Sequence, residues 1–358
     1  MRQGKQYIGQ NQLVLLLFLS NLFSYLTYYT PKGAKVGFGS SIVGLVLGNL
    51  AALGIGMLYF AIRGRLGHNL GEFLLEQNRV VGIVFSWLAA VFLGLAAVHS
   101  VCGFTSFIHR QIYTQTNYLV FLLPFLGVAL FGLLVGIESL ARTGTLIFAL
   151  TAVSLAIVLL GTLPNIDPPS LYSYSSVNLG DTATAFWGAL RGNIDLLVAL
   201  LLMQHQEKKS SRVFKKYFFL STGTAVGLSL LVHLALGPYA ATRNYPFYAL
   251  AVFSDLSVLQ RLDSFYLVVW VMVSFVRVVL LLTAMASVLQ TAVPQRAYKK
   301  TAIVFLAVVT AAAIIGCSSQ RIYDLIALLF KSGYPSLLLV LLPVCYLLAT
   351  VKRRRGER

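Results

Sequence analysis

The chain is a succession of long apolar stretches separated by short polar segments. Within each stretch the apolar residues are continuous, whereas the strands of an outer-membrane β-barrel alternate apolar and polar positions. Most stretches reach the roughly 20 residues that a helix needs to cross the hydrocarbon core of a bilayer. We therefore expect an all-α integral membrane protein with about ten transmembrane helices, at about 10–30, 40–62, 80–107, 118–137, 144–163, 186–206, 217–237, 264–290, 301–317 and 334–351.

The segments between these spans are too short to form a soluble module, so residues 1–358 are predicted to be a single polytopic transmembrane domain. The longest segment, about 164–185, begins LPNIDPPS and is rich in Pro, Ser and Tyr, which indicates a loop. A further apolar patch, IYDLIALLF at 322–330, is too brief to span a bilayer. We expect this patch to be interfacial or re-entrant.

The composition agrees with a membrane protein and argues against a nucleic-acid-binding protein. Of the 358 residues, 58% are hydrophobic and 11% are charged, and the mean hydropathy is +0.80. A soluble domain carries roughly a quarter charged residues. The net charge of +17 would suit a nucleic acid, but most Lys and Arg lie in short loops between apolar runs. Because no soluble segment interleaves basic and aromatic residues, we expect the lipid bilayer, and not a nucleic acid, as the partner.

The distribution of basic residues predicts the orientation of the chain. With the N-terminus in the cytoplasm, 19 of the 28 Lys and Arg residues fall on the cytoplasmic side and 7 on the outer side. The remaining two, Arg191 and Arg277, lie within spans. Cytoplasmic loops carry an excess of Lys and Arg in membrane proteins, so both termini are predicted to be cytoplasmic.

No enzyme or metal site is indicated. Cys102, Cys317 and Cys345 are odd in number, widely spaced, and lie in or at the ends of apolar runs, so neither a disulfide framework nor a metal site is predicted. The chain has no glycine loop before a Lys that would cradle phosphate, no paired His–Glu metal motif, and no Ser-His-Asp set in a plausible context. We expect a protein that is not an enzyme and that has no cofactor.

Polar residues interrupt the first span of each half of the chain. The loop at about 164–185 separates spans one to five, about 10–163, from spans six to ten, about 186–351. Many secondary transporters consist of two inverted repeats whose first helices are broken near the midplane, where substrate binds. The pattern therefore predicts a LeuT-like five-plus-five inverted repeat with broken helices 1 and 6. The interrupting residues are Ser20, Asn21 and Ser24 in FLSNLFSYLTYY, and Gly188, Arg191, Gly192, Asn193 and Asp195 in FWGALRGNID.

The sixth span carries two opposite charges. Arg191 and Asp195 are four residues apart and can pair on one helical face, which reduces the cost of a few kcal/mol for a charge at mid-bilayer. Gly188 and Gly192 permit non-helical torsions or a close approach of another helix. These residues either line a polar cavity in a broken helix, or Arg191 snorkels to the outer interface and the glycines serve packing.

Two more ionisable residues lie inside predicted spans. His99, in GLAAVHSVCG of span three, is either a hydrogen-bonded packing residue or part of a ligand site or proton relay. Arg277, in WVMVSFVRVVLLL, lies mid-span and is expected to face a cavity or to pair with a carboxylate such as Asp195. An interior with His99, Arg191 and Arg277 against one or two acids would suit a ligand that bears a carboxylate.

Two short patterns indicate ordinary structural contacts. Gly44 and Gly48 in GLVLG match the small-xxx-small motif of close helix packing. Glu138 and Arg142 in GIESLAR are four apart at a cytoplasmic turn and are expected to form a helix-end pair.

Three stretches resemble the spore-germination permeases, the membrane B-subunits of nutrient germinant receptors in endospore-forming bacteria. YPFYALAVFSDLSVLQRLDSFYLVVW, at 245–270, resembles the family's segment before span eight. GIESLAR, at 136–142, resembles the turn after span four, and LPNID, at 163–167, resembles the stretch after span five. The matched elements of the first stretch are Tyr245-Pro246, Arg261 with Asp263, and Trp270. With the ten-helix plan and the basic tail, the resemblance covers essentially the whole chain.

The resemblance implies a fold and a binding site. The family is similar to the amino acid–polyamine–organocation transporters, which have the five-plus-five fold, and it implies a germinant pocket, usually for an amino acid, between helices one, three, six and eight. Helix-one amides and the hydroxyls of Ser20 or Ser24 would add hydrogen-bond donors. Matched onto this sequence, the lining residues are Ser20, Asn21, Ser24, Leu95, His99, Gly188, Arg191, Gly192, Asn193, Asp195, Arg277 and Leu281.

The resemblance also implies a function and partners. The chain would be a receptor subunit in the inner membrane of the spore that binds a small nutrient and signals to a larger membrane subunit and a lipoprotein. Two alternatives stay open on the sequence: a secondary amino acid transporter that uses the same pocket, and a structural scaffold within a receptor.

Overall fold

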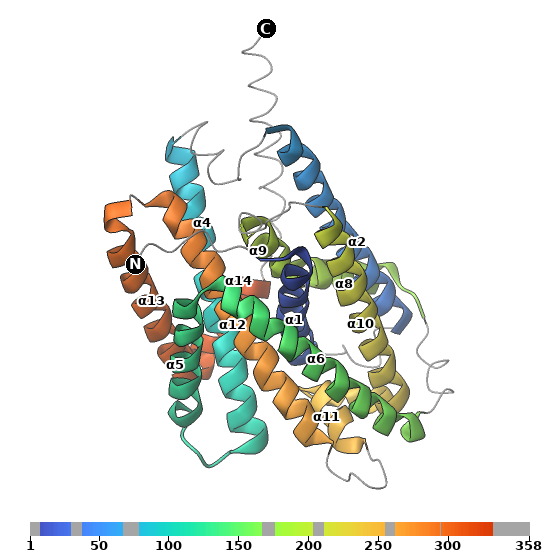
Figure 1. Cartoon of the computed structure of the whole chain (residues 1–358). Helices are drawn as coiled ribbons and strands as arrows, with labels where there is room; N and C mark the ends of the chain where they lie inside the picture. The colour runs from blue at the N-terminus through green and yellow to red at the C-terminus, as the bar shows by residue number, and fades with distance from the viewer. Residues whose placement is uncertain are drawn as a thin grey trace.

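The computed structural model describes residues 8–29, 38–66, 79–166, 176–202, 211–254, 262–293 and 295–331, and this part of the chain is built of helices. The apolar runs fold as helices because hydrocarbon offers no partner for backbone N–H and C=O groups, which a helix satisfies within itself. Figure 1 shows the helices, which are α1 (Gln10–Tyr28), α2 (Phe38–Leu66), α4 (Arg79–Phe107), α5 (Leu119–Val135), α6 (Ile137–Thr162), α8 (Leu179–Gly192), α9 (Ile194–Leu202), α10 (Arg212–Leu236), α11 (Pro246–Phe253), α12 (Asp263–Ala292), α13 (Gln295–Ser318) and α14 (Gln320–Lys331).

Seven stretches of the described residues are long and apolar enough to cross a membrane. They correspond to predicted spans two, three and five to nine, and are Phe38–Leu58, Gly82–Ile112, Ile137–Asn165, Leu179–Leu202, Arg212–Leu236, Asp263–Gln290 and Lys300–Ser318. Helices α1 and α5 lie where the first and fourth spans were predicted, and α5 is a shorter apolar helix. The predicted tenth span at 334–351 lies outside the described residues, as does Cys345.

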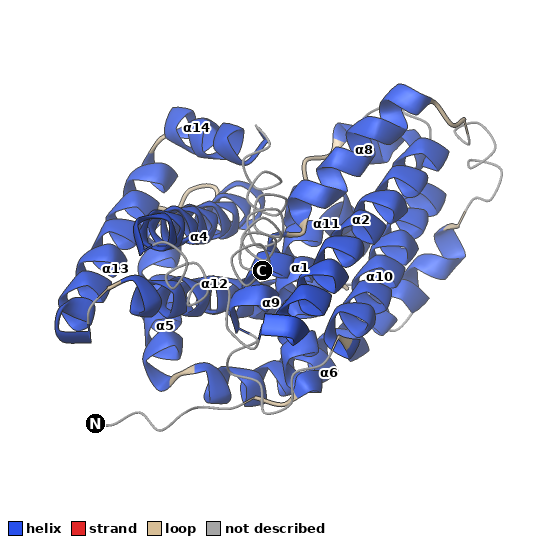
Figure 2. Cartoon of the chain, turned by 90° about the horizontal axis from the view of Figure 1, so that it is seen from above, coloured by secondary structure: helices blue, strands red, loops and turns tan. Residues whose placement is uncertain are grey.

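The helices form two groups on either side of a central pair. Helix α2 packs against α8 and α10, whereas α4 packs against α12 and α13. Figures 1 and 2 show α2, α8 and α10 on one side of the molecule and α4, α5 and α13 on the other, with α1 and α12 between them. Helix α1 contacts α6, α9, α10 and α12. The most extensive contacts therefore join an element from the first half of the chain to one from the second.

The prediction of a broken helix 1 is wrong, because α1 is continuous from Gln10 to Tyr28. The stretch contains neither Gly nor Pro, and its polar residues are accommodated by side-chain hydrogen bonds instead of an unwound backbone. The sixth predicted span is divided in two by a single residue: α8 ends at Gly192, Asn193 has φ −81° and ψ 41°, and α9 begins at Ile194.

The turn in GIESLAR requires a glycine. Gly136 has φ 99°, in the region where a side chain would be strained, and it ends α5 and begins α6. The predicted helix-end pair follows directly, since Arg142 Nη2 lies 2.6 Å from Glu138 Oε1. Both side chains are largely exposed, so this pair contributes little to stability.

The apolar patch at 322–330 lies within α14, a helix of 12 residues that is too short to span a bilayer. It packs against α4 and α13. Figure 2 shows α14 at the periphery, beside α4 and α13.

The contact between α2 and α8 depends on the two glycines of GLVLG, as the small-xxx-small pattern predicts. A Cβ atom added to Gly44 would lie 2.5 Å from the Thr182 carbonyl oxygen, and one added to Gly48 would lie 2.5 Å from that of Phe186. Real Cβ atoms do not approach a backbone oxygen so closely, so α2 would have to move away from α8. On the same helix, a Cβ added to Gly54 would have no atom of the described residues within 4 Å.

We expect Gly48→Ala to destabilise the protein by about 1–3 kcal/mol, the usual cost of overpacking. Gly54→Ala is the matched control, and we expect it to be neutral or slightly stabilising because alanine favours a helix over glycine. The measurement is unfolding of the purified protein in mixed detergent micelles. Equal stability of the two variants would contradict the close α2–α8 contact.

Candidate functional site

Four helices meet at one buried arginine. Arg277 of α12 is 5% exposed, and its hydrogen-bond partners Ser20 of α1, Ser100 of α4 and Asp195 of α9 are each 0% exposed. Helices α1 and α4 belong to the first half of the chain, and α9 and α12 to the second. We call Ser20, Asn21, Ser100, Asp195 and Arg277 the central cluster.

The guanidinium of Arg277 is held from several directions. Its Nε donates to Ser100 Oγ at 2.9 Å, and its Nη1 donates to the carbonyl oxygen of Ser20 at 2.9 Å and to Ser20 Oγ at 3.2 Å. Nη1 also lies 3.4 Å from Asp195 Oδ2, which makes a buried ion pair. The ring of Phe23 lies 5.9 Å from the guanidinium carbon, within the range of a cation–π contact.

The carboxylate of Asp195 also accepts hydrogen bonds from several groups. Ser20 Oγ donates to Oδ1, and Asn21 Nδ2 donates to Oδ2 at 3.5 Å. Asp195 lies in the first turn of α9, directly after the interruption at Asn193. The positive end of the helix dipole favours an anion at that place. The interruption therefore gives the second half of the span a helix N-terminus, and the acid occupies it.

The charges of the central cluster balance. Moving either charge from water into a low-dielectric interior costs several kcal/mol, and the mutual attraction and hydrogen bonds offset that cost only while both partners are present. The expected interior with excess positive charge is not what the cluster contains, since Asp195 neutralises Arg277. The site thus holds one cation and one anion, each within reach of the other.

A second polar network surrounds the junction between α8 and α9. The Asn193 side-chain amide donates to Asn49 Oδ1 at 2.6 Å and to the Ala189 carbonyl at 2.9 Å, and its oxygen accepts from Tyr217 at 3.1 Å. Asn49 in turn donates to Thr222 Oγ1 at 3.0 Å. Hydrogen bonds therefore join the junction between α8 and α9 to helices α2 and α10.

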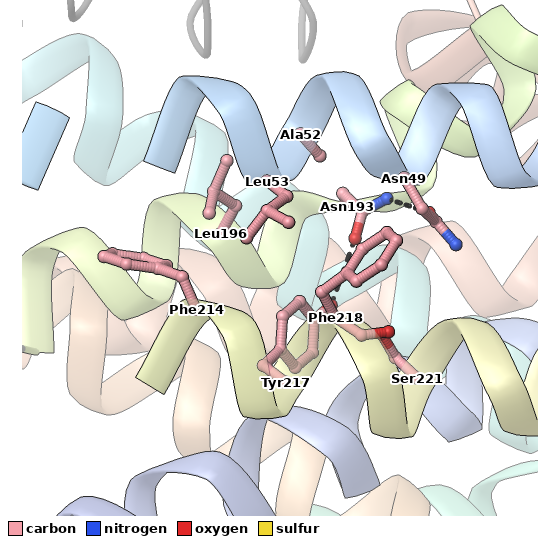
Figure 3. A pocket seen from close by; sticks show the side chains of 9 residues that line it. All are labelled: Asn49, Ala52, Leu53, Asn193, Leu196, Phe214, Tyr217, Phe218 and Ser221. Atoms are coloured by element: carbon pink, nitrogen blue, oxygen red, sulfur yellow. Dashed lines mark hydrogen bonds between the residues drawn. The ribbon is translucent and has the colours of Figure 1, made fainter. Parts of the chain in front are cut away.

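Figure 3 shows the side chains that line a small cleft at this network, among them Asn49 and Asn193, which point toward each other and are joined by a hydrogen bond. The cleft has an empty volume of about 240 Å³ including its open mouth, and its enclosed part has room for about one ordered water. The cleft is lined by Asn49, Ala52, Leu53, Asn193, Leu196, Phe214, Tyr217, Phe218 and Ser221.

The structure brings together four of the predicted site residues: Ser20, Asn21, Asp195 and Arg277. Arg191 is not among them. Its Nε donates to the Trp187 carbonyl of its own helix, while Asp195 pairs with Arg277 of α12. The interruption at Asn193 separates residues 191 and 195 onto different helices, so the expected pairing on one helical face does not occur.

Among the described residues, the two glycines of FWGALRGNID do not bring another helix close. Gly188 and Gly192 are exposed, and within the described part of the chain no atom would lie within 4 Å of a Cβ added to either. The described residues therefore give no support to the packing interpretation of these glycines.

His99 lies next to Ser100 but belongs to an aromatic stack. Its ring centroid is 4.4 Å from that of Tyr28 and 5.6 Å from that of Tyr323, and both pairs are nearly parallel. Tyr28 also donates to the His99 carbonyl at 2.9 Å. Burial raises the pKa of the Tyr323 hydroxyl, in α14, so this tyrosine is neutral at physiological pH. The stack joins α1, α4 and α14.

The remaining predicted residues lie near the cluster without touching its charges. Ser24 is one turn after Ser20 on α1, and its Oγ is buried without a hydrogen-bond partner in the described part of the chain. Leu281, one turn after Arg277, is fully buried, and Leu95 of α4 is half-buried. Helix-one amides are not available as donors, because the α1 backbone is continuous.

Sequence reasoning missed Ser100 of the central cluster, and it missed Asn49, Tyr217 and Thr222 of the network around Asn193. Ser100 is a polar residue directly after His99 in an otherwise apolar run. The polar position was therefore visible in the sequence, but attention went to His99. Asn49 is an isolated amide in the second span and would have been found by the same test for polar residues in mid-span.

Comparisons with known proteins agree with a membrane protein of transporter fold. A family model described as "Spore germination protein" matches residues 77–321. No protein of curated function matches the chain.

Two solved structures are similar over nearly the whole chain. One is a Na⁺-coupled sialic acid symporter in a substrate-bound outward-open state, with a TM-score of 0.64, 13% identity, and coverage of 95% of this chain and 80% of that one. The other is Mhp1, a nucleobase-cation-symport-1 family transporter, in a closed conformation with bromovinylhydantoin bound, with a TM-score of 0.58, 13% identity, and coverage of 94% and 78%. At this identity the likeness shows the fold alone: a multi-pass helical membrane protein of the LeuT type.

We expect Arg277→Gln and Asp195→Asn each to destabilise the protein by about 3–5 kcal/mol, because each leaves a buried charge without its partner. Arg191→Gln is the control, since Arg191 is outside the central cluster, and we expect a change of less than about 1 kcal/mol. Unfolding in mixed micelles measures all three. A loss for Arg191→Gln as large as for Arg277→Gln would contradict the assignment of the buried ion pair.

Proposed function

We propose that this chain, which belongs to the spore germination protein family, is the membrane subunit of a nutrient germinant receptor. It binds an amino acid at the central cluster, and binding triggers germination. We further propose the ten-helix, five-plus-five plan, with repeats at about 10–163 and 186–351. Both termini would lie in the cytoplasm, and the chain would lie in the inner membrane of the spore.

The observation that carries this proposal is the buried pair of opposite charges where α1, α4, α9 and α12 meet. An amino acid at neutral pH is a zwitterion with a carboxylate and an ammonium on one carbon. Its carboxylate fits Arg277, and its ammonium fits Asp195. A ligand with both charges can replace the internal pair with two new pairs and leave no buried charge alone, whereas a sugar has neither charge.

The neighbouring hydrogen-bond groups suit this exchange. Arginine presents a planar fork of donors that binds a carboxylate through two parallel hydrogen bonds. Its present contact with Asp195 is a single long one, from Nη1 at 3.4 Å, so a carboxylate bound through two parallel hydrogen bonds would be the better partner. Ser20 and Asn21 already donate to an acid here, and the Ser24 hydroxyl lies one turn away on the same helix. These side chains would orient the ligand.

Ligand binding would change the conformation by separating α9 from α12. In the ligand-free state the pair holds these helices together, and in the bound state the ligand lies between them. A ligand shifts such an equilibrium only by its difference in affinity for the two states, and the exchanged charges provide that difference. The change would pass to the other receptor subunits, a larger membrane subunit and a lipoprotein.

A secondary amino acid transporter is the alternative, and the fold supports it, since the two solved structures named above are both symporters. The receptor and the transporter require the same pocket. They differ in whether the ligand crosses the membrane.

We expect some amino acid in a panel of amino acids and sugars to raise the apparent unfolding temperature of the purified chain. A ligand at about 100 times its Kd stabilises the native state by about 2.7 kcal/mol. Each hit is compared with its amide, which lacks the carboxylate, and with the corresponding 2-hydroxy acid, which lacks the ammonium. Neither analogue should raise the apparent unfolding temperature, because each would leave one member of the buried pair without a charged partner.

The matched variant is Asp195→Asn, which keeps the shape of the side chain and removes its charge. It should abolish the shift with the amino acid, while Arg191→Gln should retain it. A sugar as the only hit, or an amide as effective as its amino acid, would contradict the zwitterion site.

Uptake separates the receptor from the transporter. We expect the chain alone in proteoliposomes not to accumulate the radiolabelled hit beyond the amount it binds. Spores that carry Asp195→Asn should fail to lose optical density in response to that hit. Accumulation of many ligand molecules per protein molecule would establish the transporter instead.

A further inference from the structure

Two cysteines distant in the sequence lie side by side in the structure. Cys102 Sγ of α4 is 2.9 Å from Cys317 Sγ of α13, and both are free thiols. Cys102 is fully buried and also contacts the Ala313 carbonyl at 3.7 Å, whereas Cys317 is half-buried. The residue before Cys317 is a glycine, and a Cβ at Gly316 would come within 3.2 Å of Cys102 Sγ. The small residue thus permits the approach of the two sulfurs.

We propose that Cys102 and Cys317 form a redox site that a hydroperoxide oxidises to a disulfide, which ties α4 to α13. The sulfurs need to approach by about 0.9 Å to reach the bond length of about 2.05 Å. Cys317 is the next-to-last residue of α13, close to the junction with α14, where a small backbone adjustment is easiest. The proposal concerns the thiols and does not depend on the proposed function.

The order of the steps follows from exposure. The Cys317 thiolate attacks one oxygen of hydrogen peroxide, the O–O bond breaks, and Cys317 becomes a sulfenic acid while the second oxygen leaves and is protonated to water. The buried Cys102 then attacks the Cys317 sulfur, and the sulfenic oxygen leaves as a second water. In total, two thiols and one peroxide give one disulfide and two waters. Because Cys102 lies against Cys317, the sulfenic acid is captured before further oxidation.

The crosslink would reinforce contacts that already join α4 to the α13–α14 region. Arg110, just beyond α4, donates to the Gln320 side chain at the start of α14, and His99 of α4 stacks on Tyr323. Cys102 lies between these two contacts along the chain. On the orientation predicted from the basic residues, this end of α4 and α13 is the outer end. A disulfide there would fix the outer end of α13 against α4 covalently.

The test is mass spectrometry of the full-length purified chain after treatment with hydrogen peroxide. Remaining thiols are blocked with N-ethylmaleimide, and the protein is digested without reduction. We expect most chains to contain a linked pair of peptides, one with Cys102 and one with Cys317, whose mass is lower by two hydrogen atoms than the sum of the thiol forms. Dithiothreitol should separate the pair.

Three serine variants complete the design. The linked pair should persist in Cys345→Ser and disappear in Cys102→Ser and Cys317→Ser. In Cys102→Ser, the sulfenic acid at Cys317 should become trappable by dimedone, because the thiol that would capture it is missing. Oxidation should also raise the apparent unfolding temperature of the wild type and of Cys345→Ser, reversibly with dithiothreitol.

Three outcomes would overturn the proposal. They are a bridge between Cys317 and Cys345, a bridge between two chains, and full labelling of both Cys102 and Cys317 by N-ethylmaleimide in the unfolded protein after peroxide treatment. None of these measurements involves a nutrient or germination, so failure here is distinguishable from failure of the proposed function.

Discussion

The structure depends on keeping one positive and one negative charge together inside a bundle of apolar helices. Arg277 and Asp195 are almost fully buried, and each is the charged partner of the other. The free energy of their burial is acceptable only if Ser20 and Ser100 supply hydrogen bonds at the same time. Four helices must therefore meet at one point, and their positions relative to one another follow from the coordination of a single guanidinium.

The interruption at Asn193 makes this coordination possible. A continuous sixth span would place Asp195 in mid-helix, where the backbone offers it nothing. Because α9 starts at Ile194, the carboxylate lies at a helix N-terminus and gains from the dipole. The Asn193 side chain, fastened to Asn49 and Tyr217, stabilises the interruption from the opposite side. The central cluster and the network around Asn193 are thus linked by the short stretch from Asn193 to Asp195.

The sequence predicted the positions of most of the described helices and included both members of the charged pair among its candidates, but it did not predict the directions of the side chains. Apolar runs predict helices well because backbone hydrogen bonds in lipid must be local, and the prediction of 80–107 is within one residue of α4 (Arg79–Phe107) at its start and matches its end. The predicted fifth span at 144–163 began two turns late because the helix starts directly after the glycine turn at Gly136.

Partners across helices depend on packing, which no local pattern encodes. The sequence therefore correctly suggested Asp195 as a partner for Arg277 but also offered Arg191, four residues away, and the one-residue interruption excluded it. The adjacency of Cys102 and Cys317 could not be predicted for the same reason, since 214 residues separate them in the chain and only the packing of α13 on α4 joins them.

The continuity of α1 bears on how a ligand can be recognised. An unwound helix offers backbone N–H and C=O groups, which bind any ligand of suitable shape. A continuous helix uses its N–H groups internally, although a carbonyl can accept a second bond, as that of Ser20 does from Arg277. Helix α1 therefore contributes to the central cluster mainly through the side chains of Ser20, Asn21 and Ser24. Recognition through side chains can be altered by single substitutions without disturbing the fold, so members of a family with this helix could acquire different ligands while keeping the same arrangement of helices.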